Sequence, residues 1–145
     1  PMNFSQEICD YTRTGREKIH KKLKSVSPVV LKYLVENPVK DETIEYNDNR
    51  IARYSGQNGC CFITGIPLEI GDIECHHKKP RDDGGNDTYR NLCLVKYDIH
   101  KLIHATKKET INRYYDKVKG ILDEDALSKL NKLRTKAGND CIEIT

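Results

Sequence analysis

The chain has 145 residues, of which 37% are hydrophobic and 32% charged, and its formal net charge is +3. A chain of this length can bury one modest core, and a mean hydropathy of −0.73 with only short apolar runs predicts no membrane span. The net charge is too small for a histone-like polycation, so contacts with nucleic acid would have to come from local clusters of charge.

One such cluster lies near the start of the chain, where six basic residues accompany a single acid, Glu17: Arg13, Arg16, Lys18, Lys21, Lys22 and Lys24. Residues 17–25 also place Ile19 and Leu23 four apart, which predicts a short basic amphipathic helix. A phosphate-binding face and an ordinary solvated helix surface explain this cluster equally well.

Two further helices are predicted before residue 60. The first starts at Ser27-Pro28 and stops at Asn37-Pro38, because proline suits the first helical turn and ends a helix that precedes it. The second is expected over residues 46–56. Its apolar side chains should face inward and its two arginines, Arg50 and Arg53, outward.

The middle of the chain predicts β-structure. The runs "CCFIT" and "GDIEC" are short and β-prone, and Gly65, Ile66 and Pro67 join them, so we expect a hairpin. The second run leads directly into His76-His77. Residues 80–91 are dense in Pro, Gly, Asp and Asn and are predicted to form a loop, followed by a brief strand, "LCLV".

Three helices are expected in the rest of the chain, over residues 97–105, about 107–119 and 123–137. Asp123 should cap the last of them, and its buried stripe should be Leu127, Leu130 and Leu133. The six cysteines show no disulfide spacing, so we expect a reduced, cytoplasmic chain.

Four of the five histidines lie between positions 76 and 104. His100 and His104 are four residues apart on a predicted helix, so they point the same way and can chelate one divalent cation. Adjacent residues of a strand point to opposite sides. If His76 faces the metal, His77 is therefore free to act as a general base.

Two further features accompany the histidines. The amide of Asn91 can pin either the loop backbone or an imidazole N–H, and so hold His77 in position. The flanking cations are candidate contacts for a phosphate backbone, although solvated loop charge explains them equally well: Lys78, Lys79 and Arg81, together with Arg53.

From about Arg50 to Ala105 the chain resembles the HNH endonucleases, through "CFITG", "CHHKKP", "GGND", "NL" and "HKLIH". The resemblance implies an α+β fold, with a small ββα-metal core (a short hairpin plus a helix) embedded in several α-helices. It also implies that His76, His100 and His104 bind the metal, that His77 is the general base and that Asn91 supports it. Gly84, Gly85 and Asp87 match the glycine-rich loop of the family.

More narrowly, "IARYSGQNGCCFITG" and the segments after it look like the C-terminal endonuclease of group II intron-encoded reverse transcriptases. This resemblance implies a piece of a larger protein that nicks the second target strand of a mobile element. We therefore expect a basic helical, DNA-binding segment at 1–45, an endonuclease core at 46–106 and a helical extension at 107–145. Expected partners are double-stranded DNA and, through the rest of the larger protein, intron RNA. The expected location is cytoplasmic, at the nucleoid.

Many HNH domains carry two Cys-x2-Cys pairs that hold a structural zinc. The matching positions here are Cys61 with Thr64 and Lys96 with Ile99, so we expect no structural zinc. The expected catalytic ion is Mg²⁺ or Mn²⁺, with Zn²⁺ or Ni²⁺ as alternatives. Two other hypotheses are a non-catalytic DNA- or RNA-binding module that retains the fold, and a purely structural metal site.

Overall fold

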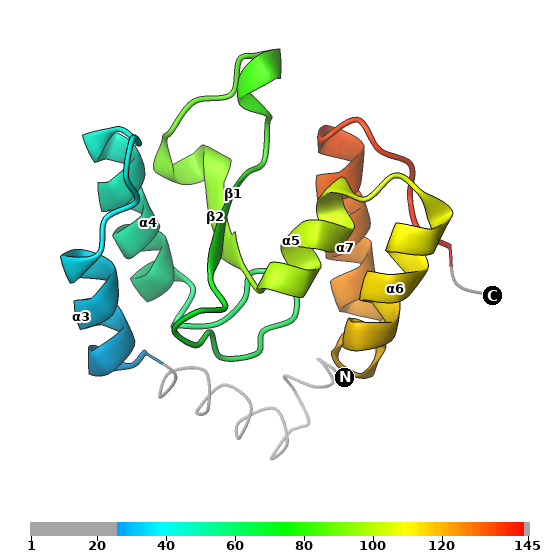
Figure 1. Cartoon of the computed structure of the whole chain (residues 1–145), viewed down its shortest axis with the longest axis horizontal. Coiled ribbons are helices and arrows are strands. Elements are labelled where there is room, and N and C mark those ends of the chain that lie inside the picture. The colour runs from blue at the N-terminus through cyan, green and yellow to red at the C-terminus, as the bar shows by residue number, and fades with distance from the viewer. Residues whose placement is uncertain (1–25, 144–145) are drawn as a thin grey trace.

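The computed structural model describes residues 26–143 of the chain. They form a mixed α+β structure in which helices surround a two-stranded antiparallel sheet (Figure 1). Its elements are α3 (Pro28–Glu36), α4 (Ile44–Gly56), β1 (Glu74–His77), β2 (Leu92–Val95), α5 (Tyr97–His104), α6 (Lys108–Val118) and α7 (Glu124–Lys136), with 3-10 turns η1 (Arg81–Asp83), η2 (Tyr89–Asn91) and η3 (Lys119–Ile121). The basic cluster at 13–24 and the helix predicted there lie outside the described residues.

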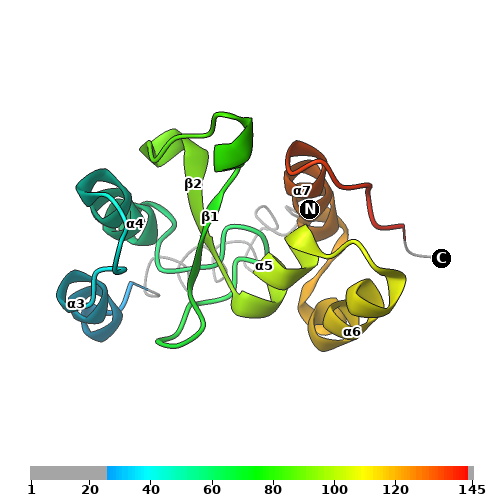
Figure 2. The ribbon, with the colours of Figure 1, turned by 45° about the horizontal axis from the view of Figure 1, so that its top comes forward.

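The sheet is the centre of the structure. β1 pairs with β2 so that His76 lies opposite Cys93 and His77 opposite Leu92. Helices α3 and α4 lie on one side of this hairpin and α5, α6 and α7 on the other (Figures 1 and 2). All four residues of β2 are buried, and one hydrophobic cluster runs from Leu34 of α3 to Leu130 and Leu133 of α7. The arrangement is compatible with a small ββα core made of β1, β2 and α5.

Helices α3, α5, α6 and α7 begin within one residue of the predicted positions. The side chains of Ser27, Thr43 and Asp123 accept hydrogen bonds from the first turns of α3, α4 and α7, as N-cap residues do. Helix α4 begins at Ile44, two residues before the predicted start. Helix α5 receives its cap from elsewhere in the sequence, because Asp72 accepts a hydrogen bond from the backbone N–H of Tyr97 at 2.7 Å.

Two sequence predictions about this region are wrong. The run "CCFIT" does not pair with "GDIEC": it folds back as a turn with one bridge between Cys60 and Pro67, and β1 pairs with β2 instead. Arg50 is not outward but 8% exposed. It shares the buried face of α4 with Tyr46 and Tyr54, at intervals of four residues, and donates to the carbonyl of Asn37 at 3.3 Å.

Arg134 links α7 to the C-terminal end of α5 by hydrogen bonds. It is 2% exposed, and its Nη1 donates to the carbonyls of Leu102 and Ala105, the latter at 2.8 Å. Leu102 lies in the last turn of α5 and Ala105 is its C-cap residue. The carbonyls at a helix C-terminus have no hydrogen-bond partners within the helix. Burial lowers the pKa of Arg134, but the guanidinium remains charged at neutral pH. Helix α7 therefore holds the helix that carries His100 and His104.

Within residues 26–143, no helix combines the length and the apolar character that crossing a bilayer requires. The described cysteines are unpaired thiols, and three of them, Cys60, Cys61 and Cys93, are buried.

Candidate metal centre

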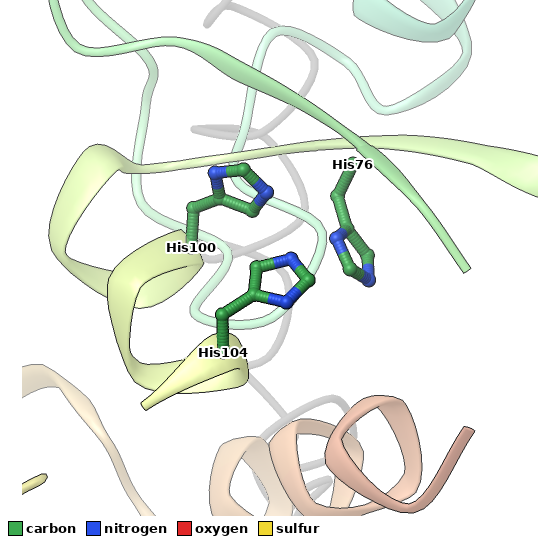
Figure 3. A group of neighbouring side chains, drawn as sticks. All are labelled: His76, His100 and His104. Carbon is green, nitrogen blue, oxygen red and sulfur yellow. The ribbon is translucent and has the colours of Figure 1, made fainter. Parts of the chain in front are cut away.

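Three imidazoles meet between β1 and α5. His76 comes from the strand, and His100 and His104 come from successive turns of the helix (Figure 3). Their ring centroids lie 4.8 to 5.2 Å apart. One nitrogen from each ring can be chosen so that all three lie within 4.8 Å of one another. Among residues 26–143, this is the one cluster of His, Cys, Asp or Glu side chains able to hold a metal ion.

The environment keeps these imidazoles neutral. Burial, followed by the charges of the neighbouring histidines, lowers the pKa of His76 to about 3. Burial and His104 lower the pKa of His100 to about 4, and burial also lowers the pKa of His104. At neutral pH each ring therefore carries a free lone pair, which is the form that binds a metal ion.

The residues present fit a bound cation. His76 is 1% exposed, and its Nε2 is the buried side-chain polar atom that has no hydrogen-bond partner in the described part of the chain. Burying an imidazole nitrogen without a partner costs free energy, and a metal ion would satisfy it. Metal–imidazole bonds are about 2.0–2.1 Å long, so binding requires the rings to move together by small rotations. The three histidines could thus hold a metal ion.

A carboxylate lies beside one of these ligands. Glu74 Oε1 lies 3.6 Å from Nδ1 of His100, and burial raises the pKa of Glu74. A carboxylate beside one ring nitrogen favours a proton on that nitrogen and leaves the other for the metal. Nε2 is therefore the expected ligand atom of His100.

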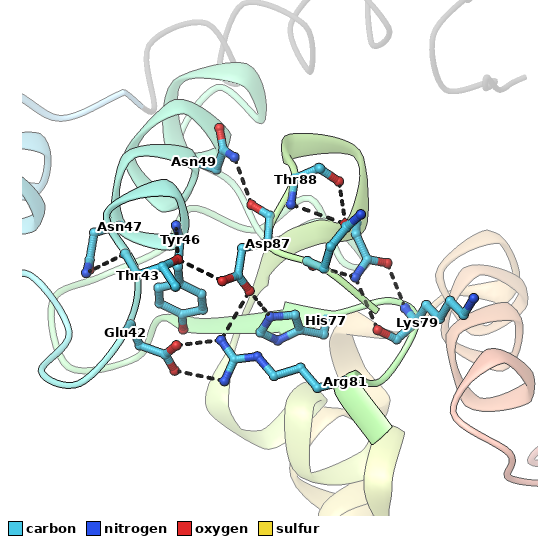
Figure 4. A network of polar contacts seen from close by, with 12 residues as sticks. Glu42, Thr43, Tyr46, Asn47, Asn49, His77, Lys79, Arg81, Asp87 and Thr88 are labelled. Atoms are coloured by element: carbon cyan, nitrogen blue, oxygen red, sulfur yellow. Dashed lines mark hydrogen bonds and ion pairs between the residues drawn. The ribbon is translucent and has the colours of Figure 1, made fainter. Parts of the chain in front are cut away.

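His77 points away from the three-histidine cluster, as alternation along a strand requires. Its Nε2 lies 2.8 Å from Oδ1 of Asp87 (Figure 4), and its ring stacks on Tyr46 of α4 with centroids 5.7 Å apart. In a neutral imidazole the nitrogen facing a carboxylate carries the proton. This arrangement leaves Nδ1 of His77 as the nitrogen that can accept one.

Asp87 is itself held on several sides. Its Oδ2 accepts a hydrogen bond from the Thr43 hydroxyl at 2.7 Å, and its backbone carbonyl accepts one from Asn49 at 2.8 Å. The contact with His77, with smaller contributions from Thr43 and Arg81, lowers the pKa of Asp87 to about 2. Asp87 is therefore a fixed anion beside His77 at neutral pH.

Asn91 contacts the loop backbone and not His77. Its side chain accepts from the N–H of Lys79 at 2.9 Å and donates to the carbonyls of Lys79 and Asn86. A further backbone hydrogen bond runs from Lys78 to the carbonyl of Asn91 at 2.7 Å. The Asn91 side chain therefore holds the loop backbone and does not contact the imidazole of His77.

The flanking cations differ in their surroundings. Arg81 lies between Glu42 and Asp87, with its Nη2 3.1 Å from the latter, and these two acids raise its pKa. Arg53 donates to the carbonyl of Tyr89 at 2.9 Å and lies 4.0 Å over its ring. Lys78 lies 4.6 Å over the Phe62 ring, and burial together with the charges of Arg53 and Lys136 lowers its pKa. Arg81 and Arg53 thus make contacts within the chain.

Sequence reasoning left three carboxylates without a role at the site: Glu74, Asp72 and Asp87. Glu74 lies two residues before His76, so strand alternation puts the two on the same face, and this spacing could have found it. Asp72 and Asp87 act on residues in other elements, and their positions depend on how the chain folds.

No family model, curated protein or solved structure matches this chain.

Proposed function

We propose that this chain is a metal-dependent DNA endonuclease of the HNH type that hydrolyses phosphodiester bonds. The observation that carries the proposal is the division between two adjacent histidines. His76 lies with His100 and His104, whereas His77 lies against the fixed carboxylate of Asp87. A hydrolytic site needs both a ligand set and a separate base, and a purely structural metal site needs no such base.

The residues divide the chemistry as follows. A divalent cation held by the three imidazoles would bind the scissile phosphate and stabilise the departing oxygen. His77 accepts a proton from the attacking water at Nδ1, because its Nε2 faces Asp87. The Asp87 carboxylate then stabilises the imidazolium that forms, as a carboxylate beside a catalytic histidine does. Asn91 keeps the loop that carries these groups in shape.

We favour Mg²⁺ or Mn²⁺ as the ion in use. Three neutral imidazoles prefer Zn²⁺ or Ni²⁺ by affinity, but an ion that also takes substrate oxygens as ligands can be a harder one.

The resemblance to group II intron proteins supports a nuclease that nicks target DNA for a mobile element, with 3′-hydroxyl and 5′-phosphate ends and a cytoplasmic, nucleoid-associated location.

The experiment is nicking of supercoiled plasmid by the chain with Mg²⁺, Mn²⁺, Zn²⁺ or EDTA, beside a His104→Ala variant. Open circles that form only with metal, and far more slowly with the variant, are the expected result. The alternative function, a DNA- or RNA-binding module without chemistry, predicts that DNA is retarded on a gel but stays supercoiled with every metal.

A further inference from the structure

A polar pocket lies outside the histidine cluster. It has a volume of about 310 Å³ and is formed by the β1–β2 loop together with the last residue of α7. Its cationic side chains are Lys78, Lys79, Arg90 and Lys136. Figure 4 shows Lys79 at the edge of the β1–β2 loop. None of the three clustered histidines lines it.

Within residues 26–143 the four cations have no acidic partners. No carboxylate lines the pocket, and the ion pairs among residues 26–143 involve other side chains. Arg81, three residues from Lys78, shows the contrast, because it is flanked by Glu42 and Asp87. Like charges that converge without counterions repel one another, so this pocket is suited to an anion from outside the chain.

The loop is shaped for close approach. A Cβ at Gly85 would lie 1.8 Å from the backbone carbonyl oxygen of Lys79, and Gly84 has a φ of +90°, which L side chains rarely adopt. These glycines let the loop fold tightly against Lys79, whose Nζ would lie 3.8 Å from a Cβ added at Gly84. Lys79, Arg90 and Lys136 are all exposed and can reach a ligand without rearrangement.

We infer that this pocket binds a backbone phosphate of the nucleic acid. Arginine and lysine are the side chains that contact phosphates in such complexes, and a space of this size with four cations matches one charged group of a long polyanion. Lys78 directly follows His77, the last residue of β1, so one wall of the pocket is adjacent in sequence to the proposed general base. The choice of DNA as ligand rests on the proposed function. The new element is α7, whose Lys136 brings the C-terminal helices into the binding face.

The test measures binding of a labelled DNA duplex by fluorescence anisotropy, in EDTA so that nothing is cleaved, over a series of salt concentrations. The variants are Arg90→Gln and Lys136→Gln, with Lys32→Gln, an exposed lysine of α3, as the matched control. Each pocket variant should bind about 3- to 10-fold more weakly. It should also reduce the slope of log K against log salt by about 0.9, the loss of one phosphate contact. The control should change neither quantity.

Pocket variants that bind duplex like the Lys32→Gln control would overturn the inference. So would displacement of the duplex by poly-glutamate as effectively as by unlabelled DNA, since the pocket would then accept any polyanion. Repeating the titration with an RNA duplex distinguishes DNA from RNA as the source of the bound phosphate. The inference and the proposed function can fail independently. If the chain never nicks plasmid, Lys136→Gln can still weaken its binding of the duplex. If the chain does nick plasmid, its affinity for the duplex can still be unchanged by Lys136→Gln.

Discussion

At the residue scale, two neighbouring histidines have different surroundings. Strand alternation was sufficient to predict that His76 and His77 point apart, and helical spacing was sufficient to predict that His100 and His104 point together. The partner of His77 could not be predicted in the same way. Asp87 is held beside it by hydrogen bonds from Thr43, the N-cap residue of α4, and from Asn49 of α4, contacts between segments far apart in the sequence.

Asp87→Asn tests the contact with His77. The amide keeps the size of the side chain but not its charge, so it cannot stabilise an imidazolium. We expect nicking to slow by roughly 10²- to 10⁴-fold, the contribution of a correctly positioned general base, with unchanged affinity for the metal ion. Single-turnover nicking rates and calorimetric titration with Mn²⁺ measure the two quantities.

The matched control is Asp83→Asn, an exposed carboxylate of the same loop, which should nick at the parent rate. If Asp87→Asn also nicks at that rate, Asp87 does not act on the base.

At the element scale, local patterns predicted the helices well and the strand pairing badly. N-cap residues and the prolines that start or end a helix act within a few residues of the chain, so the bounds of α3, α5 and α7 follow from the sequence. The run "CCFIT" has the β-propensity of a strand, but β2 takes the partner that buries all four of its residues, and that partner is β1. Arg50 was misplaced because its acceptor, the carbonyl of Asn37, comes with the packing of α3 against α4.

Gly85→Ala tests the shape of the β1–β2 loop. The added Cβ would meet backbone atoms of Lys79 and Pro80, and backbone cannot rotate away, so the loop must shift. We expect a loss of roughly 1–3 kcal/mol in the free energy of unfolding, measured by urea denaturation, and slower nicking.

Gly120→Ala is the control for this substitution, because a Cβ there meets nothing within 4 Å. Its free energy of unfolding should stay within about 0.5 kcal/mol of the parent. Equal stabilities for the two alanine variants would mean that the loop is not constrained at Gly85.

At the scale of the whole molecule, one hydrophobic core joins the helices on both sides of the hairpin. The histidine cluster is part of this structure, since it links β1 to α5 and Arg134 links α5 to α7. A ligand that binds only the folded chain therefore stabilises all of it. The proposed DNA-binding role of residues 13–24 stays a prediction, because these residues lie outside the described part of the chain.

Metal binding should accordingly raise the melting temperature. At a metal concentration 100-fold above Kd the gain is about 2.7 kcal/mol, and EDTA should reverse it. His100→Ala removes one ligand and should abolish most of the shift, while His77→Ala should retain it. Differential scanning fluorimetry with Zn²⁺ or Mn²⁺ measures this, and an unchanged shift in His100→Ala would exclude the three-histidine site.

The most direct test of the nuclease proposal compares the parent and its His77→Ala variant in the same plasmid-nicking reaction with Mn²⁺, after calorimetry has shown equal metal affinity. We predict metal-dependent open circles from the parent and none above background from the variant, because the ligands remain but the base is gone. Nicking by His77→Ala at the parent rate would contradict the assignment of the base.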